Sequence, residues 1–144
     1  MMHSQPDSDF YAWTTESAAR LRDGRVSEVD IERVAEELDD MGKNQKHALG
    51  SHLKVLVVHL LKWRYQPGLR GVSWRLSIAN ARDEIAELLE DSPSLATQLP
   101  EILRRRYPAA RSRAALETGL ALATFPAECP FSIAQLLDME FWAE

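Results

Sequence analysis

Residues 49–63 read Leu-Gly-Ser-His-Leu-Lys-Val-Leu-Val-Val-His-Leu-Leu-Lys-Trp, and they predict the centre of the fold. One helical row through it is apolar at every step and consists of Leu49, Leu53, Leu56, Leu60 and Trp63. Around residues 55–61 the other faces are apolar as well. A helix that is apolar all round is enclosed by other elements. The stretch therefore predicts a central, buried helix from about residue 44 to residue 65, ended by Gln66-Pro67-Gly68.

The segments before this helix also show helical periodicity, and none shows a convincing alternation of period two. Phe10, Trp13, Ser17 and Leu21 share one helical face, and Asp23-Gly24 ends that helix. A second helix is expected to open at Ser27 and to end or bend at Gly42. Its apolar stripe comprises Ile31, Val34, Ala35, Leu38 and Met41.

After residue 65 the pattern predicts a helix that Ser73 caps and that stops at Ser92-Pro93. Its apolar stripe comprises Trp74, Ile78, Ala81, Ile85 and Leu88. Residues 94–118 are helical, but Pro100 and Pro108 are expected to divide them into two or three pieces before Gly119. The prolines of residues 125–131 require an extended return loop. Ser132 and Gln135 form a capping-box pair that opens a last helix to about Phe141.

Composition indicates an ordinary soluble protein of 144 residues, with 45% hydrophobic residues and a net charge of −5. The first residues show no signal-peptide pattern, and the apolar run Val55–Leu61 is too short to cross a bilayer. Cys129 is alone, which excludes an internal disulfide and fits a reducing compartment. We expect a cytoplasmic all-α protein: a flexible N-terminus over residues 1–8, then a single compact helical bundle over residues 9–144.

Charge is strongly segregated along the chain. Residues 43–82 contain eight Lys or Arg and no Asp or Glu, whereas the segments before and after carry net charges of −7 and −6. One interpretation is neutralisation between helices, with Asp39, Asp40, Glu84, Glu87 and Glu90 as partners. The other is a phosphate track made of Lys43, Lys46, Lys54, Arg64 and Arg70. The acidic pI of about 5.4 disfavours nucleic acid and favours neutralisation.

Several segments together resemble a known family. They are Asp9-Phe10-Tyr11-Ala12-Trp13-Thr14, Glu36-Glu37-Leu38 with Met41-Gly42, His59-Leu60-Leu61-Lys62-Trp63 with Gln66-Pro67, Ser73-Trp74-Arg75, Pro93-Ser94-Leu95, Glu117-Thr118-Gly119-Leu120, and Phe125-Pro126 with Cys129-Pro130. From about residue 9 to residue 141 the chain resembles the bacterial family catalogued as domain of unknown function number twenty-nine. The resemblance implies an all-α fold and a bacterial source, and it implies no activity.

Glu117 is the most informative candidate for a site. On a helix through Ala110, Ala114 and Ala121 it lies within a face of small residues, so we expect a largely buried carboxylate. Such a carboxylate needs a cation, because an unpaired buried charge is costly. Arg82, Arg75, His59 and Lys62 are the expected partners. Two interpretations stay open: a polar pocket with Glu117 as a general base, and the favoured one, a structural ion pair.

The other reactive and aromatic side chains have structural interpretations. His52 and His59 are seven residues apart, about 10 Å along a helix, which is too far for a chelating pair. No metal is therefore predicted, and His59 is expected to be a hydrogen-bonded core histidine. Cys129 is expected to be a buried thiol. Trp13, Trp63 and Trp74 are expected in the core, and the alternative is that their rings form a stacking platform for bases. Lys62, Trp63 and Trp74 are the candidate binding residues.

No phosphate loop, nucleophile elbow, zinc signature or dinucleotide fingerprint is present, and no cofactor is predicted. The sequence favours a non-enzymatic interaction or binding module, whose partner is an unknown protein, with no membrane association. The alternative is an enzyme, or a binder of a small anion or of nucleic acid, with a polar site around Glu117, His59 and Arg75 or Arg82.

Overall fold

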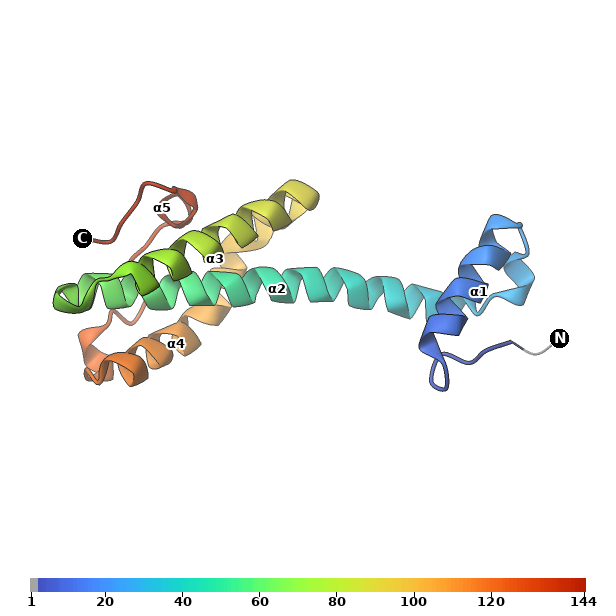
Figure 1. Ribbon diagram of the computed structural model, residues 1–144, viewed down its shortest axis with the longest axis horizontal. Coiled ribbons are helices and arrows are strands. Elements are labelled where there is room, and N and C mark those ends of the chain that lie inside the picture. Colours follow the sequence, from blue (N-terminus) through green and yellow to red (C-terminus); the bar gives the residue numbers. More distant parts are fainter. Residues whose placement is uncertain (1–2) are drawn as a thin grey trace. The chain divides into compact units, whose positions relative to one another are not determined.

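The computed structural model describes residues 3–144, and within them the chain is all-α, as the sequence predicts. The described residues form no strand and comprise the helices α1 (Phe10–Arg22), α2 (Ile31–Tyr65), α3 (Val72–Asp91), α4 (Leu99–Thr118) and α5 (Ile133–Leu137), joined by short 3₁₀ turns (Figure 1). By the contacts between its residues, the chain divides into two compact units, residues 1–43 and residues 44–144. The single domain expected over residues 9–144 stays a prediction.

The first unit contains α1 and the beginning of α2. Asp9 caps α1 by accepting from the Ala12 N–H at 3.1 Å, and Gly24 follows its end with a φ of 74°. Of the expected stripe on α1, Trp13 and Ser17 are buried, whereas Phe10 and Leu21 are exposed. The flexible terminus expected over residues 1–8 lies partly outside the described residues. Within them, the Ser4 N–H donates to Glu16 Oε2 at 3.0 Å.

The second and third expected helices are one helix, α2, which runs through Gly42 without a break. It begins at Ile31 rather than near Ser27, because the Asp30 carboxylate caps it by accepting from the Arg33 N–H at 3.0 Å. Ser27 lies instead in a 3₁₀ turn, Val26–Glu28. A single glycine costs a helix only about 1 kcal/mol relative to alanine, so Gly42 alone does not end one.

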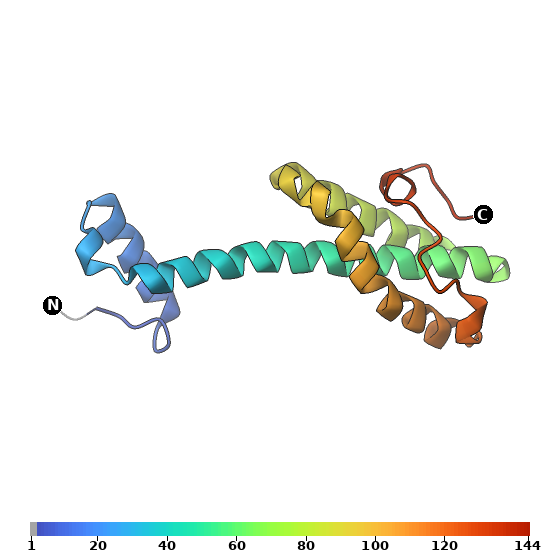
Figure 2. The ribbon, with the colours of Figure 1, turned by 180° about the vertical axis from the view of Figure 1, so that it is seen from behind.

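The hydrophobic core lies in the second unit, where α3 and α4 lie against the C-terminal half of α2 (Figures 1 and 2). The predicted row of α2 is its centre: the four leucines are 0% exposed and Trp63 is 4% exposed. Ile78, Ala81 and Ile85 of α3 and Ala110 and Ala114 of α4 pack into the same cluster. The enclosure is not complete, because Val55 is 42% exposed and His59 is half-buried. One face of α2 is therefore open.

Two predicted helix boundaries in this unit are wrong. α3 begins at Val72, so Ser73 lies inside the helix and does not cap it. α4 continues through Pro108, although proline removes one backbone hydrogen bond there. Tyr107 and Ala110, on either side of Pro108, are buried in the core, and this packing favours a continuous helix. Pro100 lies in the first turn, where proline is tolerated, and Gly119 ends α4 with a φ of 73°.

The return loop after α4 is held by side chains that donate to backbone carbonyls. The Tyr107 hydroxyl donates to Pro126 O at 2.6 Å, and Arg111 donates to Phe125 O. Arg82, only 2% exposed, donates to Leu136 O at 2.9 Å and to Gln135 O at 3.2 Å. The capping box of Ser132 and Gln135 is present, but α5 ends at Leu137 rather than near Phe141. Arg82 thus anchors α5.

Truncation of the central row tests this core. Leu56→Ala should lower the free energy of unfolding by about 2–5 kcal/mol, because it leaves a cavity where the side chain is fully buried. Urea denaturation followed by circular dichroism measures the change. Leu116→Ala is the matched control, since Leu116 of α4 is 75% exposed and its truncation should change stability by less than about 0.5 kcal/mol. A neutral Leu56→Ala would contradict the described core.

Candidate functional site

The open face of α2 forms one wall of a hollow, and α4 forms the other. The hollow has a volume of about 450 Å³ and is called here the α2–α4 pocket. It is lined by Ser51, Lys54, Val55, Val58 and His59 of α2 and by Arg106, Arg113 and Glu117 of α4. These eight described residues carry three permanent positive charges and one carboxylate. The pocket is therefore cationic, although the whole chain is acidic.

Arg106 is held in place by α2. Its Nη2 lies 3.1 Å from His47 Nδ1 and donates to His47 O at 3.3 Å. A Cβ atom added at Gly50 would lie 2.7 Å from Arg106 Nε and 3.1 Å from its Cζ. The guanidinium thus lies directly against the helix backbone, where only glycine leaves room. Gly50 is the residue that permits this arrangement.

Glu117 is paired as expected, but it is not largely buried. Its Oε1 accepts from Lys62 Nζ at 3.1 Å and its Oε2 accepts from Arg113 Nε at 2.7 Å, while 31% of its side chain is exposed. The prediction of burial fails because Glu117 lies in the last turn of α4, at the rim of the pocket. Burial raises the pKa of this carboxyl, but hydrogen bonds and charges from Arg113 and Lys62 outweigh it and hold the pKa below its ordinary value.

His59 lines the same pocket, so the structure brings two of the predicted site residues together. Its Nδ1 lies 2.8 Å from the backbone carbonyl of Val55. A carbonyl only accepts hydrogen bonds, so Nδ1 carries the hydrogen and Nε2 of the neutral ring is an acceptor. His59 is hydrogen-bonded as expected, but it is half-buried rather than part of the core.

The remaining predicted site residues lie elsewhere. Arg75 and Arg70 stack on the ring of Trp63, at 5.8 and 5.2 Å from its centroid, and Lys62 lies 4.9 Å from that of Trp74. Arg82 donates to two backbone carbonyls within α5, those of Gln135 and Leu136. None of these residues lines the α2–α4 pocket. Trp63 is 4% exposed, so its ring is not available for stacking with a ligand.

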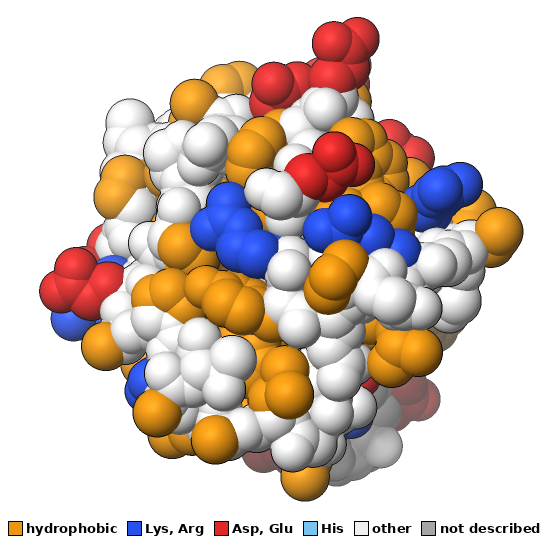
Figure 3. Space-filling view, turned by 90° about the vertical axis from the view of Figure 1, so that its left-hand side faces the viewer, with side chains coloured by type: hydrophobic (Ala, Val, Ile, Leu, Met, Phe, Trp, Pro, Cys, Tyr) orange, Lys and Arg blue, Asp and Glu red, His pale blue; other side chains and the backbone are white. Residues whose placement is uncertain are grey.

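The basic block is not neutralised as expected. Within residues 3–144, Lys62 is the one Lys or Arg of residues 43–82 that lies within 4.0 Å of a carboxylate. Within residues 44–144, Glu84 is the one expected acidic partner that forms an ion-pair contact with the block, at 4.0 Å from His52. Arg64 instead lies over Phe131, at 4.9 Å from its centroid. The end of the unit where α2 stops shows Lys and Arg side chains beside apolar ones (Figure 3). At this end of the unit, the basic side chains other than Lys62 lie over aromatic rings rather than beside carboxylates.

Sequence reasoning missed Gly50, Ser51, Arg106 and Arg113. Arg106 and Arg113 lie outside the basic block and looked like ordinary charges of an acidic segment. One signal was present: a glycine inside a strongly periodic helix commonly marks a close approach. It could have indicated that something packs on Gly50, but not that Arg106 does.

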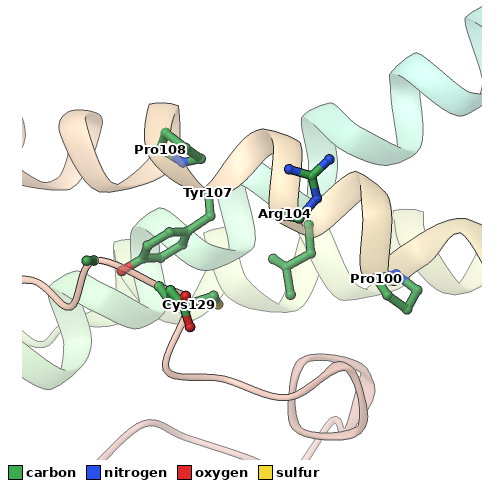
Figure 4. A pocket seen from close by; sticks show the side chains of 8 residues that line it. Pro100, Arg104, Tyr107, Pro108 and Cys129 are labelled. Carbon is green, nitrogen blue, oxygen red and sulfur yellow. The ribbon is translucent and has the colours of Figure 1, made fainter.

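A second hollow, of about 420 Å³, surrounds Cys129 (Figure 4). Tyr107 reaches from α4 toward the loop that carries Cys129, and burial raises the pKa of Tyr107 to about 12. Burial also raises the pKa of the partly buried Cys129 thiol, which keeps it protonated. The described residues that line this hollow include no histidine, and Arg104 is paired with Glu101. This pocket offers no activated nucleophile.

Within residues 3–144, no group of three or more His, Cys, Asp or Glu side chains is arranged to hold a metal ion. No helix in the same part of the chain is both long enough and apolar enough to span a bilayer.

The pair of Glu117 with Lys62 predicts a pH-dependent stability. Glu117→Gln should lower the free energy of unfolding at pH 7 by about 1–2 kcal/mol, because Lys62, only 8% exposed, loses its counter-ion. In the folded state the pKa of Glu117 lies below the ordinary 4.5, so its ion pair contributes its full stability above pH 4.5. This contribution disappears as the pH falls through the folded-state pKa. Urea denaturation of both proteins between pH 3 and 7 measures this. A difference that stays constant at acidic pH would contradict the pairing.

Comparison with known proteins gives the family. No curated protein and no solved structure matches the chain. Residues 7–142 match the family described as Domain of unknown function DUF29, which covers nearly the whole chain and confirms the resemblance seen in the sequence. The protein therefore belongs to the DUF29 family.

Proposed function

We propose that the protein is a binding module and that its α2–α4 pocket binds a small anion. One observation carries the proposal: Lys54, Arg106 and Arg113, from two helices, line one hollow that contains a single carboxylate, and that carboxylate is paired with Arg113, which leaves Lys54 and Arg106 for a ligand. Arg106 is in addition positioned over Gly50, with His47 as its hydrogen-bond partner. A guanidinium that is already oriented loses less side-chain freedom when a ligand binds.

The residues of the pocket suit an oxyanion. Arginine and lysine make charge-assisted hydrogen bonds to phosphate and carboxylate oxygens, and the Ser51 hydroxyl is a further donor. A hollow of about 450 Å³ has the ordinary size of a small-molecule site. The remaining basic residues do not extend it into a track, because Arg64 and Arg70 lie against aromatic rings. A concave site of this kind favours a small ligand over a nucleic-acid strand.

The enzyme alternative has less support. Glu117 is engaged by two cations, and His59 is the one histidine among the described residues that line the pocket. An unknown protein partner, a cytoplasmic location and a bacterial source stay predictions from the sequence.

Gly50→Ala tests the proposal without removing a charge. The new methyl group should displace Arg106 and weaken the binding of inorganic phosphate about tenfold, as the loss of one charge-assisted contact does. Stability should be unchanged or raised by up to about 1 kcal/mol, because alanine is the better helix former. Isothermal titration calorimetry at low ionic strength measures binding, and thermal unfolding measures stability.

The matched control is Arg105→Ala. Arg105 neighbours Arg106 on α4, but it is exposed and paired with Glu101 outside the pocket. It should change phosphate affinity by less than about twofold, since exposed charges act weakly at a distance. No phosphate binding by the unchanged protein, or equal binding by the Gly50→Ala variant, would overturn the proposed function.

A further inference from the structure

The two walls of the α2–α4 pocket give it two chemically different ends. α4 runs in the same direction as α2, since Arg106 contacts His47 and Glu117 contacts Lys62. With a rise of 1.5 Å per residue, Lys54 and His59 are separated by about 7.5 Å along α2. Ser51, Lys54 and Arg106 thus lie toward one end, and His59 and Glu117 lie toward the other.

The first end supplies hydrogen-bond donors. Lysine and arginine donate and cannot accept, and the serine hydroxyl can do both. Arg106 is oriented there by His47 and Gly50. This end is complementary to a phosphate group.

The second end supplies acceptors. The ionised Glu117 carboxylate has about four lone-pair positions, of which Lys62 and Arg113 occupy two. His59 Nδ1 donates to Val55 O, so Nε2 is the ring nitrogen that accepts a hydrogen bond when the ring is uncharged. These groups take hydrogen bonds from hydroxyl or amino groups. A second phosphate would meet the negative charge of Glu117.

Resting on the proposed function, we infer that the pocket binds a phosphorylated small molecule that carries hydroxyl groups, of which a sugar phosphate is the simplest kind. The phosphate lies at Ser51, Lys54 and Arg106, and the hydroxyl groups donate to His59 and Glu117. The described lining contains no aromatic ring other than His59, so it offers no platform for a nucleobase. Inorganic phosphate fills only the first end.

A matched pair of ligands tests the second end. Ribose 5-phosphate and pentyl phosphate have the same charge and five carbons each, but pentyl phosphate has no hydroxyl group. Isothermal titration calorimetry should show ribose 5-phosphate binding about tenfold more tightly, the effect of one charge-assisted hydrogen bond. Inorganic phosphate and free ribose are titrated beside them, and ribose alone should bind much more weakly than its phosphate.

Variants then assign the preference to the residues. Glu117→Gln and His59→Phe should each reduce the preference for ribose 5-phosphate over pentyl phosphate several-fold. The preference is a ratio of two affinities, so any change in the binding of the phosphate group, which both ligands carry, cancels from it. Gly50→Ala should weaken all three phosphate ligands and leave the preference unchanged. Far-ultraviolet circular dichroism shows that each variant is folded.

The possible results separate the two proposals. If ribose 5-phosphate and pentyl phosphate bind equally while phosphate still binds, this inference is overturned and the proposed function stands. A preference that survives in both Glu117→Gln and His59→Phe also overturns the inference, because the hydroxyl groups would then be bound elsewhere. If no phosphate ligand binds to the unchanged protein, the proposed function fails together with it.

Discussion

The structure of residues 44–144 depends on the burial of one row of side chains on α2. Leu49, Leu53, Leu56 and Leu60 are inaccessible to solvent, and α3, α4 and the return loop all contribute to the cluster around them. Apolar burial of this kind is the largest favourable contribution to folding. This row determines where α4 packs on α2. The position of α4 in turn determines which of its side chains reach the opposite side of α2.

That opposite side is where the packing leaves α2 uncovered. Val55 is exposed, His59 is half-buried, and Arg106 lies against Gly50 instead of an apolar side chain. A row of leucines on one face and a cationic pocket on another thus occupy the same stretch of helix. The pocket is rigidly positioned because its walls are helices held by the core, and sites on rigid elements keep their geometry better than sites on loops.

Particular residues show how far prediction from the sequence reached. The buried row of α2, the apolar stripe of α3, the end of α4 at Gly119 and the capping box of Ser132 and Gln135 are local patterns, and the structure has them. The breaks expected at Gly42 and Pro108 are wrong, because α2 and α4 continue through these residues. A glycine or a proline inside a helix costs a few kcal/mol at most, and the stabilisation of the rest of the helix outweighs this cost. The pairing of Glu117 with Lys62 was among the expected ones, whereas Arg82 and Arg75 have other partners.

Local patterns are sufficient to identify the helical class, the central helix and the family, because periodicity, capping and motif order are properties of neighbouring residues. The packing of α4 against α2 is what brings Arg106 and Arg113, from an acidic part of the chain, into one pocket with Lys54 and His59. Contacts between residues more than fifty positions apart depend on how two helices pack and on their relative rotation. A local pattern contains neither quantity, so the composition of the pocket follows from packing alone.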